Sequence, residues 1–234
     1  MKKTSFLAIT LLVIIVSPFK GLSQTTEIEL FVRPSFTPFL VLQDNRGIYE
    51  DYDGQLKLSF GGTVNVLLTS KSNLGISLLY DSRGIVDAIE FRDENNYIIS
   101  TEGVKIVGDF LTLPVTWRWR TGNKIKWQFE AGLYASYQLR EKMIYPFKIP
   151  TLIDGEIVET DVVKTPGVYK KADFGSVFGV SSYIPLNDKL SLLVGVNAII
   201  SGVNLGKITN DKAYSTSLGL NVGLSYKLGK ATSD

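Results

Sequence analysis

The sequence predicts an all-β fold, an eight-stranded antiparallel up-and-down transmembrane β-barrel. Three observations lead to this prediction. Apolar residues alternate with small or polar residues along eight segments, so each segment would form a strand with one apolar face. Short and long connections alternate between these segments. After the first residues, no apolar run approaches the roughly 18 residues that a membrane-spanning helix needs.

The last segment, residues 214–228, shows the pattern most clearly. Its even positions are apolar or aromatic except for Thr216, and its odd positions are Ser, Gly, Asn or Lys. Tyr214 and Tyr226 stand near the two ends of the apolar face, with aliphatic residues between them. An apolar band flanked by aromatic residues is typical of a strand that crosses a membrane. A soluble, half-buried strand also alternates, so the prediction depends on repetition along the chain.

Seven earlier segments repeat the alternation, at residues 28–36, 56–69, 74–81, 111–120, 125–139, 173–184 and 190–201. We expect the first strand to be irregular because it contains Pro34 and is followed by Pro38. Pro114 lacks a backbone N–H, so a local bulge is expected in the fourth strand. Eight strands is the size of the smallest bacterial outer-membrane barrels.

The connections predict which way the barrel faces. Residues 70–73, 121–123 and 185–188 form short links, whereas residues 43–54, 84–103, 142–170 and 204–212 form longer, more polar ones. Outer-membrane barrels have short periplasmic turns and long external loops, so we expect both termini in the periplasm. Residues 90–99 and 151–158 resemble hairpins that extend past the membrane, the second around an Asp-Gly turn. These hairpins are either a binding surface or a strand overhang that orders the barrel mouth.

Residues 1–23 are predicted to be a cleavable signal peptide. Lys2 and Lys3 precede an apolar run at residues 6–16, and the small residues Gly21 and Ser23 suit cleavage. The run is too short for an anchor helix. Residues 24–234 would then form one outer-membrane β-barrel domain in the cell outer membrane.

Composition argues against several functions. The chain has no Cys and no His, and its 25 basic residues nearly balance its 23 acidic residues. It therefore offers no disulfide, no histidine base and no basic surface for nucleic acid. We predict no catalytic residue, no metal and no cofactor, and we expect the protein not to be an enzyme, since lipid-modifying chemistry on such barrels generally relies on His.

Charged residues on the polar faces are expected to line the barrel interior. They either pair with one another and fill the lumen or form a polar pathway, and pairing is favoured because eight strands leave no open channel. The predicted lumen residues are Glu29, Arg33, Lys57, Arg118, Lys126 and Glu130, with Asp81, Arg83 and Asp173 expected near a rim. Aromatic residues at the ends of apolar faces are expected to anchor the barrel at the membrane interfaces rather than to form a ligand cage: Tyr80, Trp117, Trp119, Trp127, Tyr137, Tyr214 and Tyr226.

A soluble, lipocalin-like periplasmic carrier is the main alternative fold. It would place the apolar faces inside, around a ligand, and the polar faces in water. Gly, Ser, Thr and Asn dominate the polar faces, whereas a surface in bulk water would hold more Lys and Glu. We therefore expect the polar faces to point inward and the apolar faces to contact lipid.

Four stretches resemble the PorT-like outer-membrane β-barrel domain family of Bacteroidota: residues 109–120, 130–137, 173–180 and 217–226. The resemblance implies a structural or accessory envelope or secretion component that acts through loops and turns. Its partners would be outer-membrane lipid, the barrel insertion machinery and envelope or secretion-system proteins. The alternative is a small transport or ligand-binding barrel. Residues 227–234 depart from the terminal aromatic residue with which many such proteins end.

Overall fold

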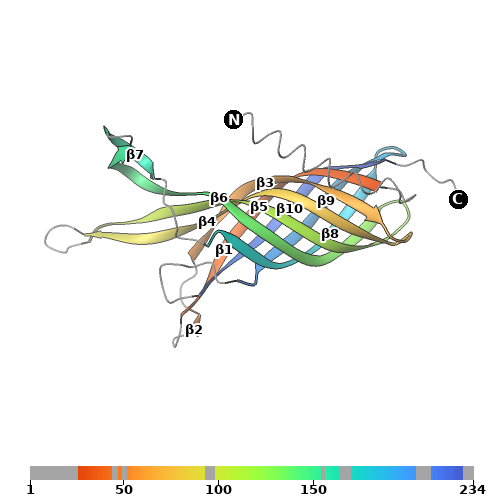
Figure 1. Cartoon of the computed structure of the whole chain (residues 1–234), viewed down its shortest axis with the longest axis horizontal. Coiled ribbons are helices and arrows are strands. Elements are labelled where there is room, and N and C mark those ends of the chain that lie inside the picture. The colour runs from red at the N-terminus through yellow and green to blue at the C-terminus, as the bar shows by residue number, and fades with distance from the viewer. Residues whose placement is uncertain are drawn as a thin grey trace.

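The computed structural model describes residues 26–43, 47–48, 52–92, 98–153, 156–163, 170–203 and 212–228 (Figure 1). The predicted signal peptide and its cleavage position lie outside these residues. Within the described ranges, no helix has the length and hydropathy needed to cross a membrane.

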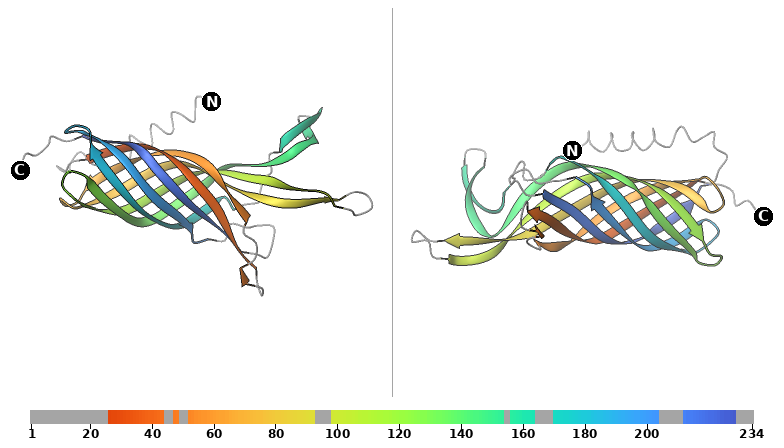
Figure 2. Two further views of the ribbon diagram at one scale, coloured as in Figure 1. Left: turned by 180° about the vertical axis from the view of Figure 1, so that it is seen from behind. Right: turned by 90° about the horizontal axis from the view of Figure 1, so that it is seen from below.

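Eight long strands close into one barrel (Figures 1 and 2). Each strand pairs antiparallel with the next one in the wall, and the last pairs with the first, as when Leu30 lies opposite Leu224. Closure leaves no free edge in the wall, which confirms the predicted up-and-down barrel. The wall strands are β1 (Thr26–Gln43), β3 (Tyr52–Leu67), β4 (Ser72–Arg92), β5 (Ile98–Thr121), β6 (Lys126–Ile153), β8 (Ala172–Pro185), β9 (Leu190–Ser201) and β10 (Lys212–Lys227).

Two further strands lie outside the wall. β2 (Gly47–Ile48) pairs with the end of β1, and β7 (Glu156–Val163) pairs with β6 in the part of the chain that the structure describes. Ile153 lies opposite Glu156, so the predicted hairpin at residues 151–158 is confirmed. Arg92 likewise pairs with Ile98, although the residues between them lie outside the described ranges.

Three wall strands are much longer than a membrane requires. β4, β5 and β6 contain 21, 24 and 28 residues, whereas about 9–11 tilted residues cross a bilayer. Beyond the barrel, residues 87–92 pair with residues 98–104, and residues 145–153 run beside residues 156–163. We call these ribbons the β4–β5 arm and the β6–β7 arm, and both project past the same end of the barrel (Figure 2).

The short turns lie together at the opposite end, which we call the short-turn end (Figure 1). Leu68 N donates to Ser72 O at 2.9 Å, and Leu186 N donates to Leu190 O at 2.9 Å. Gly122 has φ +98°, a conformation that favours glycine. Leu228 N donates to Thr26 O at 2.8 Å, so the two ends of the described barrel also meet here.

The prolines affect strand regularity in two different ways. The β1–β3 register shifts between Thr37 and Phe39, at Pro38, as expected. The bulge predicted at Pro114 is wrong, because the β4–β5 register is the same on both sides of it. Pro114 interrupts the hydrogen-bond ladder without inserting a residue. The register of β5 shifts instead between Asp109 and Phe110 against β6, and near its start, at Ile98–Ser100, against β4.

The two faces of the wall have opposite chemistry. Leu56 is 77% exposed and Leu133 69% exposed on the outer surface, whereas Arg33, Asp81 and Asp173 are completely buried inside. A soluble barrel would have the reverse arrangement. The outward apolar surface therefore excludes the lipocalin-like alternative and fits a barrel surrounded by lipid.

Candidate functional site

The barrel interior contains two polar networks. We call the one nearer the short turns the turn-side network; its centre is Arg118 with Glu29 and Glu130. The other, the loop-side network, contains Arg33, Asp81, Arg83 and Asp173. Along β1, Glu29, Phe31 and Arg33 occupy successive inward positions, so apolar side chains lie between the two networks on this side of the lumen.

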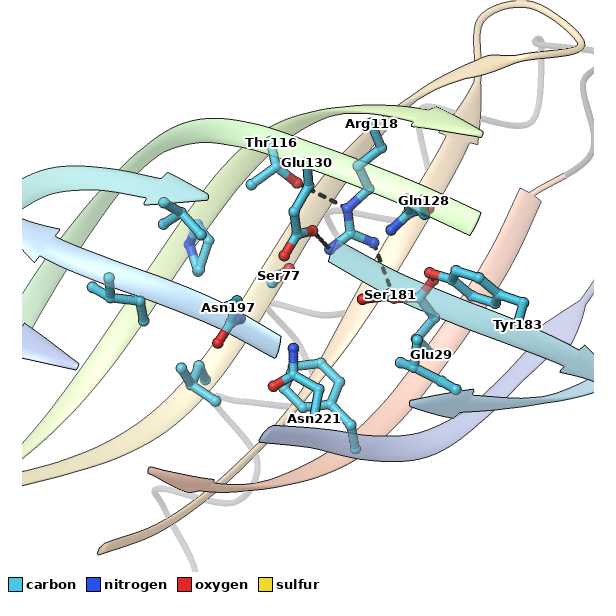
Figure 3. A pocket seen from close by; sticks show the side chains of 16 residues that line it. Glu29, Ser77, Thr116, Arg118, Gln128, Glu130, Ser181, Tyr183, Asn197 and Asn221 are labelled. Carbon is cyan, nitrogen blue, oxygen red and sulfur yellow. Dashed lines mark hydrogen bonds and ion pairs between the residues drawn. The ribbon is translucent and has the colours of Figure 1, made fainter. Parts of the chain in front are cut away.

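Arg118 binds carboxylates from two other strands (Figure 3). Its Nη1 lies 2.9 Å from Glu29 Oε2, and its Nη2 lies 2.8 Å from Glu130 Oε2. It also donates to Thr116 Oγ1 at 2.9 Å and to Asn65 Oδ1 at 2.7 Å. A buried arginine needs this degree of pairing because its desolvation is unfavourable.

Glu29 connects the turn-side network across the barrel. It accepts hydrogen bonds from Asn65 Nδ2 at 2.5 Å and from Tyr183 Oη at 2.6 Å, in addition to the Arg118 ion pair. Arg120 continues the network towards the short-turn end, where it pairs with Glu27. The Arg120 guanidinium also lies 4.4 Å from the centre of the Tyr183 ring, a cation–π geometry.

The loop-side network is centred on Arg83. Its Nε lies 2.8 Å from Asp81 Oδ2, and its Nη1 lies 2.5 Å from Asp173 Oδ2. Arg33 Nη1 lies 3.4 Å from Asp81 Oδ1, and Arg33 Nε donates to Asn197 Oδ1 at 2.7 Å. The two arginines and two aspartates have balanced charge, so the network can remain buried as a unit.

An apolar layer fills the space between the networks. Leu79, Val177 and Ile199 are each 2% exposed, and Phe31 packs against them. The enclosed space beside this layer has a volume of about 20 Å³ (Figure 3), roughly enough for one water molecule. Among the described residues, the middle of the interior is therefore packed with side chains and has no room for a solute.

Glycines on the inner face make room for the arginines. A Cβ added at Gly75 would collide with the Arg118 side chain, and one added at Gly219 would collide with Arg33. The small residues that suggested a crowded lumen in the sequence therefore lie directly against its largest cations.

The predicted lumen residues occupy three kinds of position. Glu29, Arg33, Arg118 and Glu130 lie inside the two networks. Lys57 is half-buried near the long-loop end, beside Gly84. Lys126 is exposed at the start of β6, at the short-turn end of the lumen.

The three residues expected near a rim are buried, and two partners were missed. Asp173 is the second residue of β8 and bonds to Ser201 at the end of β9, so it and its partner Arg83 lie at the loop-side end of these strands. Asp81, Arg83 and Asp173 are nevertheless at most 1% exposed. Glu27 and Arg120 were missed, although each lies two residues from a predicted lumen residue and so shares its face.

The predicted interfacial aromatics lie on the outer face. Trp119, Trp127 and Tyr226 lie near the short-turn end and are 46%, 50% and 44% exposed. Trp117 and Tyr137 are each 54% exposed, whereas Tyr80 and Tyr214 are half-buried. The Tyr80 ring stacks on Phe60 with 5.1 Å between their centres. The described residues contain no group of three or more His, Cys, Asp or Glu side chains suited to a metal ion.

Comparison with protein families agrees with this geometry. The model of the outer membrane protein beta-barrel domain matches residues 23–201. The chain belongs to the outer membrane protein β-barrel domain family. Because proteins of this family lie in the outer membrane, the apolar outer face of the barrel is in contact with lipid. No curated protein matches the chain.

Solved structures resemble the chain at low sequence identity. OprG from Pseudomonas aeruginosa is 9% identical, with 87% of this chain and 95% of that one covered and a TM-score of 0.49. Ail of Yersinia pestis is 6% identical, with coverage of 87% and 99% and a TM-score of 0.41. Neisserial surface protein A is 10% identical, with coverage of 86% and 96% and a TM-score of 0.45. We draw no functional argument from these similarities.

Proposed function

We propose that this outer-membrane barrel is a structural or accessory envelope component, PorT-like in role, that acts through its arms and turns. The observation that carries the proposal is the contrast between a lumen filled by paired charges and two strand ribbons that extend beyond it. A filled lumen does not favour solute passage, whereas projecting strands offer contact surface.

We propose that a partner binds along an edge of the β6–β7 arm. In the described part of the chain, β7 pairs on one side with β6, and beyond Ile144 β6 pairs with β7. A two-stranded ribbon in water is marginally stable by itself, and an open strand edge can accept another strand. A partner that adds a strand to the β6–β7 arm would stabilise the arm and gain specificity.

The proposed orientation places the arms outside the cell and the short-turn end in the periplasm. It follows the usual sidedness of outer-membrane barrels, with export directed by residues 1–23 and insertion machinery reading the last strand. We assign no reaction to the protein, since its sequence has no His to act as a base. Its outward aromatics, including Trp127 and Tyr137, would hold it at the two interfaces.

Deleting one arm at a time tests the proposal. Residues 145–163 are replaced by a short Gly-Ser linker in one variant, and residues 87–104 in a matched variant. Cross-linking in the native envelope followed by affinity capture identifies partners, and the gel shift between unheated and heated samples reports barrel folding. We expect a folded barrel that loses a partner in at least one variant. Unchanged partners in both variants, or altered solute uptake with unchanged partners, would contradict the proposal and favour a transport or ligand-binding barrel.

A further inference from the structure

The lumen opens at the short-turn end into a cavity that the two networks do not fill. Its volume is about 110 Å³, and strands β1, β5, β6, β8, β9 and β10 contribute to its lining with the β5–β6 turn. Among the described residues that line it, four are basic, namely Arg120, Lys124, Lys126 and Lys227, and one is acidic, Glu27. The cavity therefore concentrates positive charge in a partly enclosed space.

One acidic residue neutralises only part of this cluster of four basic residues. Glu27 forms an ion pair with Arg120. Within the described part of the chain, no ion pair is formed by Lys124, Lys126 or Lys227. Lys126 lies close enough to Lys227 and Arg120 for charge repulsion with both, and the nearby Glu27 carboxylate offsets only part of it. An anion at the centre would relieve this repulsion.

Arg120 contributes positive charge to the cavity wall. Its Nη2 is buried on the side of the turn-side network, 3.5 Å from Glu29 Oε1. The hydroxyl-bearing residues Ser191 and Ser225 line the same cavity from paired positions on β9 and β10. Cationic side chains together with hydroxyl donors suit an oxyanion with several acceptor atoms.

The mouth is held by strand ends rather than by a free loop. Lys227 N donates to Lys189 O at 2.9 Å, which joins the end of β10 to the β8–β9 turn. Lys126 lies opposite Tyr183 in the β6–β8 ladder, and Tyr183 is itself tied to Glu29. These pairings fix the backbone positions from which the cationic side chains reach the cavity.

We propose that the short-turn mouth is a binding site for a phosphate group, carried by a lipid headgroup or by a free phosphate. A volume of about 110 Å³ exceeds the roughly 30 Å³ that one water occupies and leaves space for a tetrahedral oxyanion. The phosphate site is inferred from the side chains at the mouth alone. A lipid can supply the phosphate because the barrel lies in the outer membrane. That this lipid belongs to the inner leaflet depends in addition on the proposed orientation.

Binding measurements on the full chain, folded in maltoside micelles without phosphate, test the proposal. Calorimetry uses three probes: inorganic phosphate, dihexanoyl phosphatidylglycerol, and dihexanoylglycerol, which lacks the phosphate. The test variant is K126Q/K227Q. The control K71Q/K189Q removes the same charge from exposed lysines that lie at the same end but do not line the cavity. K124Q provides a second test variant in a turn, should the double variant fold poorly.

We expect K126Q/K227Q and K124Q each to weaken phosphate or phospholipid binding, the double variant by at least about tenfold, with the control unchanged. Tighter binding of the phospholipid than of inorganic phosphate would assign the site to a headgroup, and the reverse to a free anion. No binding of either probe, equal binding of dihexanoylglycerol, or equal weakening in the control would overturn the proposal. The arm deletions leave this end intact, so the proposed function and the phosphate site can fail independently.

Discussion

Arg118 shows why individual residues in the lumen are difficult to replace. It is 5% exposed and pairs with two buried carboxylates, those of Glu29 and Glu130. The ion pairs offset the unfavourable desolvation of the buried charges, but they add little net stability to the fold. The effect of a substitution therefore depends on what it leaves behind, because removal of the arginine leaves two buried negative charges facing each other.

We predict that Arg118→Met lowers the free energy of unfolding by about 3–5 kcal/mol, the loss typical of a broken buried pair. The measurement is urea unfolding of the barrel in lipid vesicles, followed by the gel shift. Arg140→Met is the control, since Arg140 pairs with Asp109 but its side chain is 67% exposed. Its loss should not exceed about 1 kcal/mol. Equal losses in the two variants would show that Arg118 is not a structural centre.

The sequence predicts which charged residues face the lumen, but not which of them form ion pairs with one another. Alternation placed Glu29, Arg118 and Glu130 on inward faces. A charged side chain in contact with lipid is very unfavourable, so the polar face of each strand is expected to be the inward one. Which carboxylate meets which guanidinium depends on the stagger between strands, which local sequence does not encode. Arg118 and Glu130 are cross-strand neighbours, whereas Glu29 reaches Arg118 across the lumen.

At the level of elements, alternation predicts a strand where its two faces meet different surroundings. It located the wall strands, and the two arm hairpins at residues 90–99 and 151–158 were also expected. It did not predict that residues 82–89, 100–110 and 140–150 continue β4, β5 and β6 into these arms. In residues 85–92, both alternating sets mix apolar and charged residues, since Ile89 shares a set with Asp87 and Val86 shares the other with Glu90. An arm outside the membrane has no lipid face, so the physical reason for alternation ends where the bilayer ends.

Close approach between neighbouring strands gives a second prediction. A Cβ on Gly175 would collide with the backbone carbonyl of Ile200, which cannot move without separating β8 from β9. We expect Gly175→Ala to lower the free energy of unfolding by about 1–3 kcal/mol, as overpacking does. Gly202→Ala is the matched control, because its Cβ would lie 3.5 Å from the nearest atom, Phe174 O. Unfolding of both variants in urea, measured by the gel shift, checks the difference, and an unaffected Gly175 variant would contradict it.

The distribution of residues is the reverse of that in a water-soluble globular protein, with ion pairs inside and leucines outside. Leu30, Leu56 and Leu133 are more than half exposed, which in water would promote aggregation. In a bilayer the same apolar surface contacts apolar lipid chains. Closure of the wall pairs the backbone N–H and C=O groups, to which lipid chains cannot form hydrogen bonds. Fold, location and surface chemistry therefore depend on one another.

The inverted surface predicts a position-dependent effect of charge. Leu133 lies mid-way through the membrane-crossing part of β6, and Leu133→Arg should lower the free energy of unfolding in vesicles by about 2–4 kcal/mol. Leu186→Arg changes a comparably exposed leucine in the β8–β9 turn, outside the apolar band, and should have little effect. The folded fraction at increasing urea concentration compares the two. Similar losses at both positions would argue against a bilayer around the barrel wall.

The place of β1 in the lumen has a consequence for how the barrel forms. Glu29 and Arg33 both lie on this first strand, and their partners come from β3, β4, β5, β8, β9 and β10. Before the first strand has paired with the last, arginines such as Arg118 would therefore lack a carboxylate partner from β1 while they are already inside the membrane. Intermediates of that kind are penalised, so insertion should proceed as an all-or-none event in which the seam between first and last strands acts as a checkpoint for correct assembly.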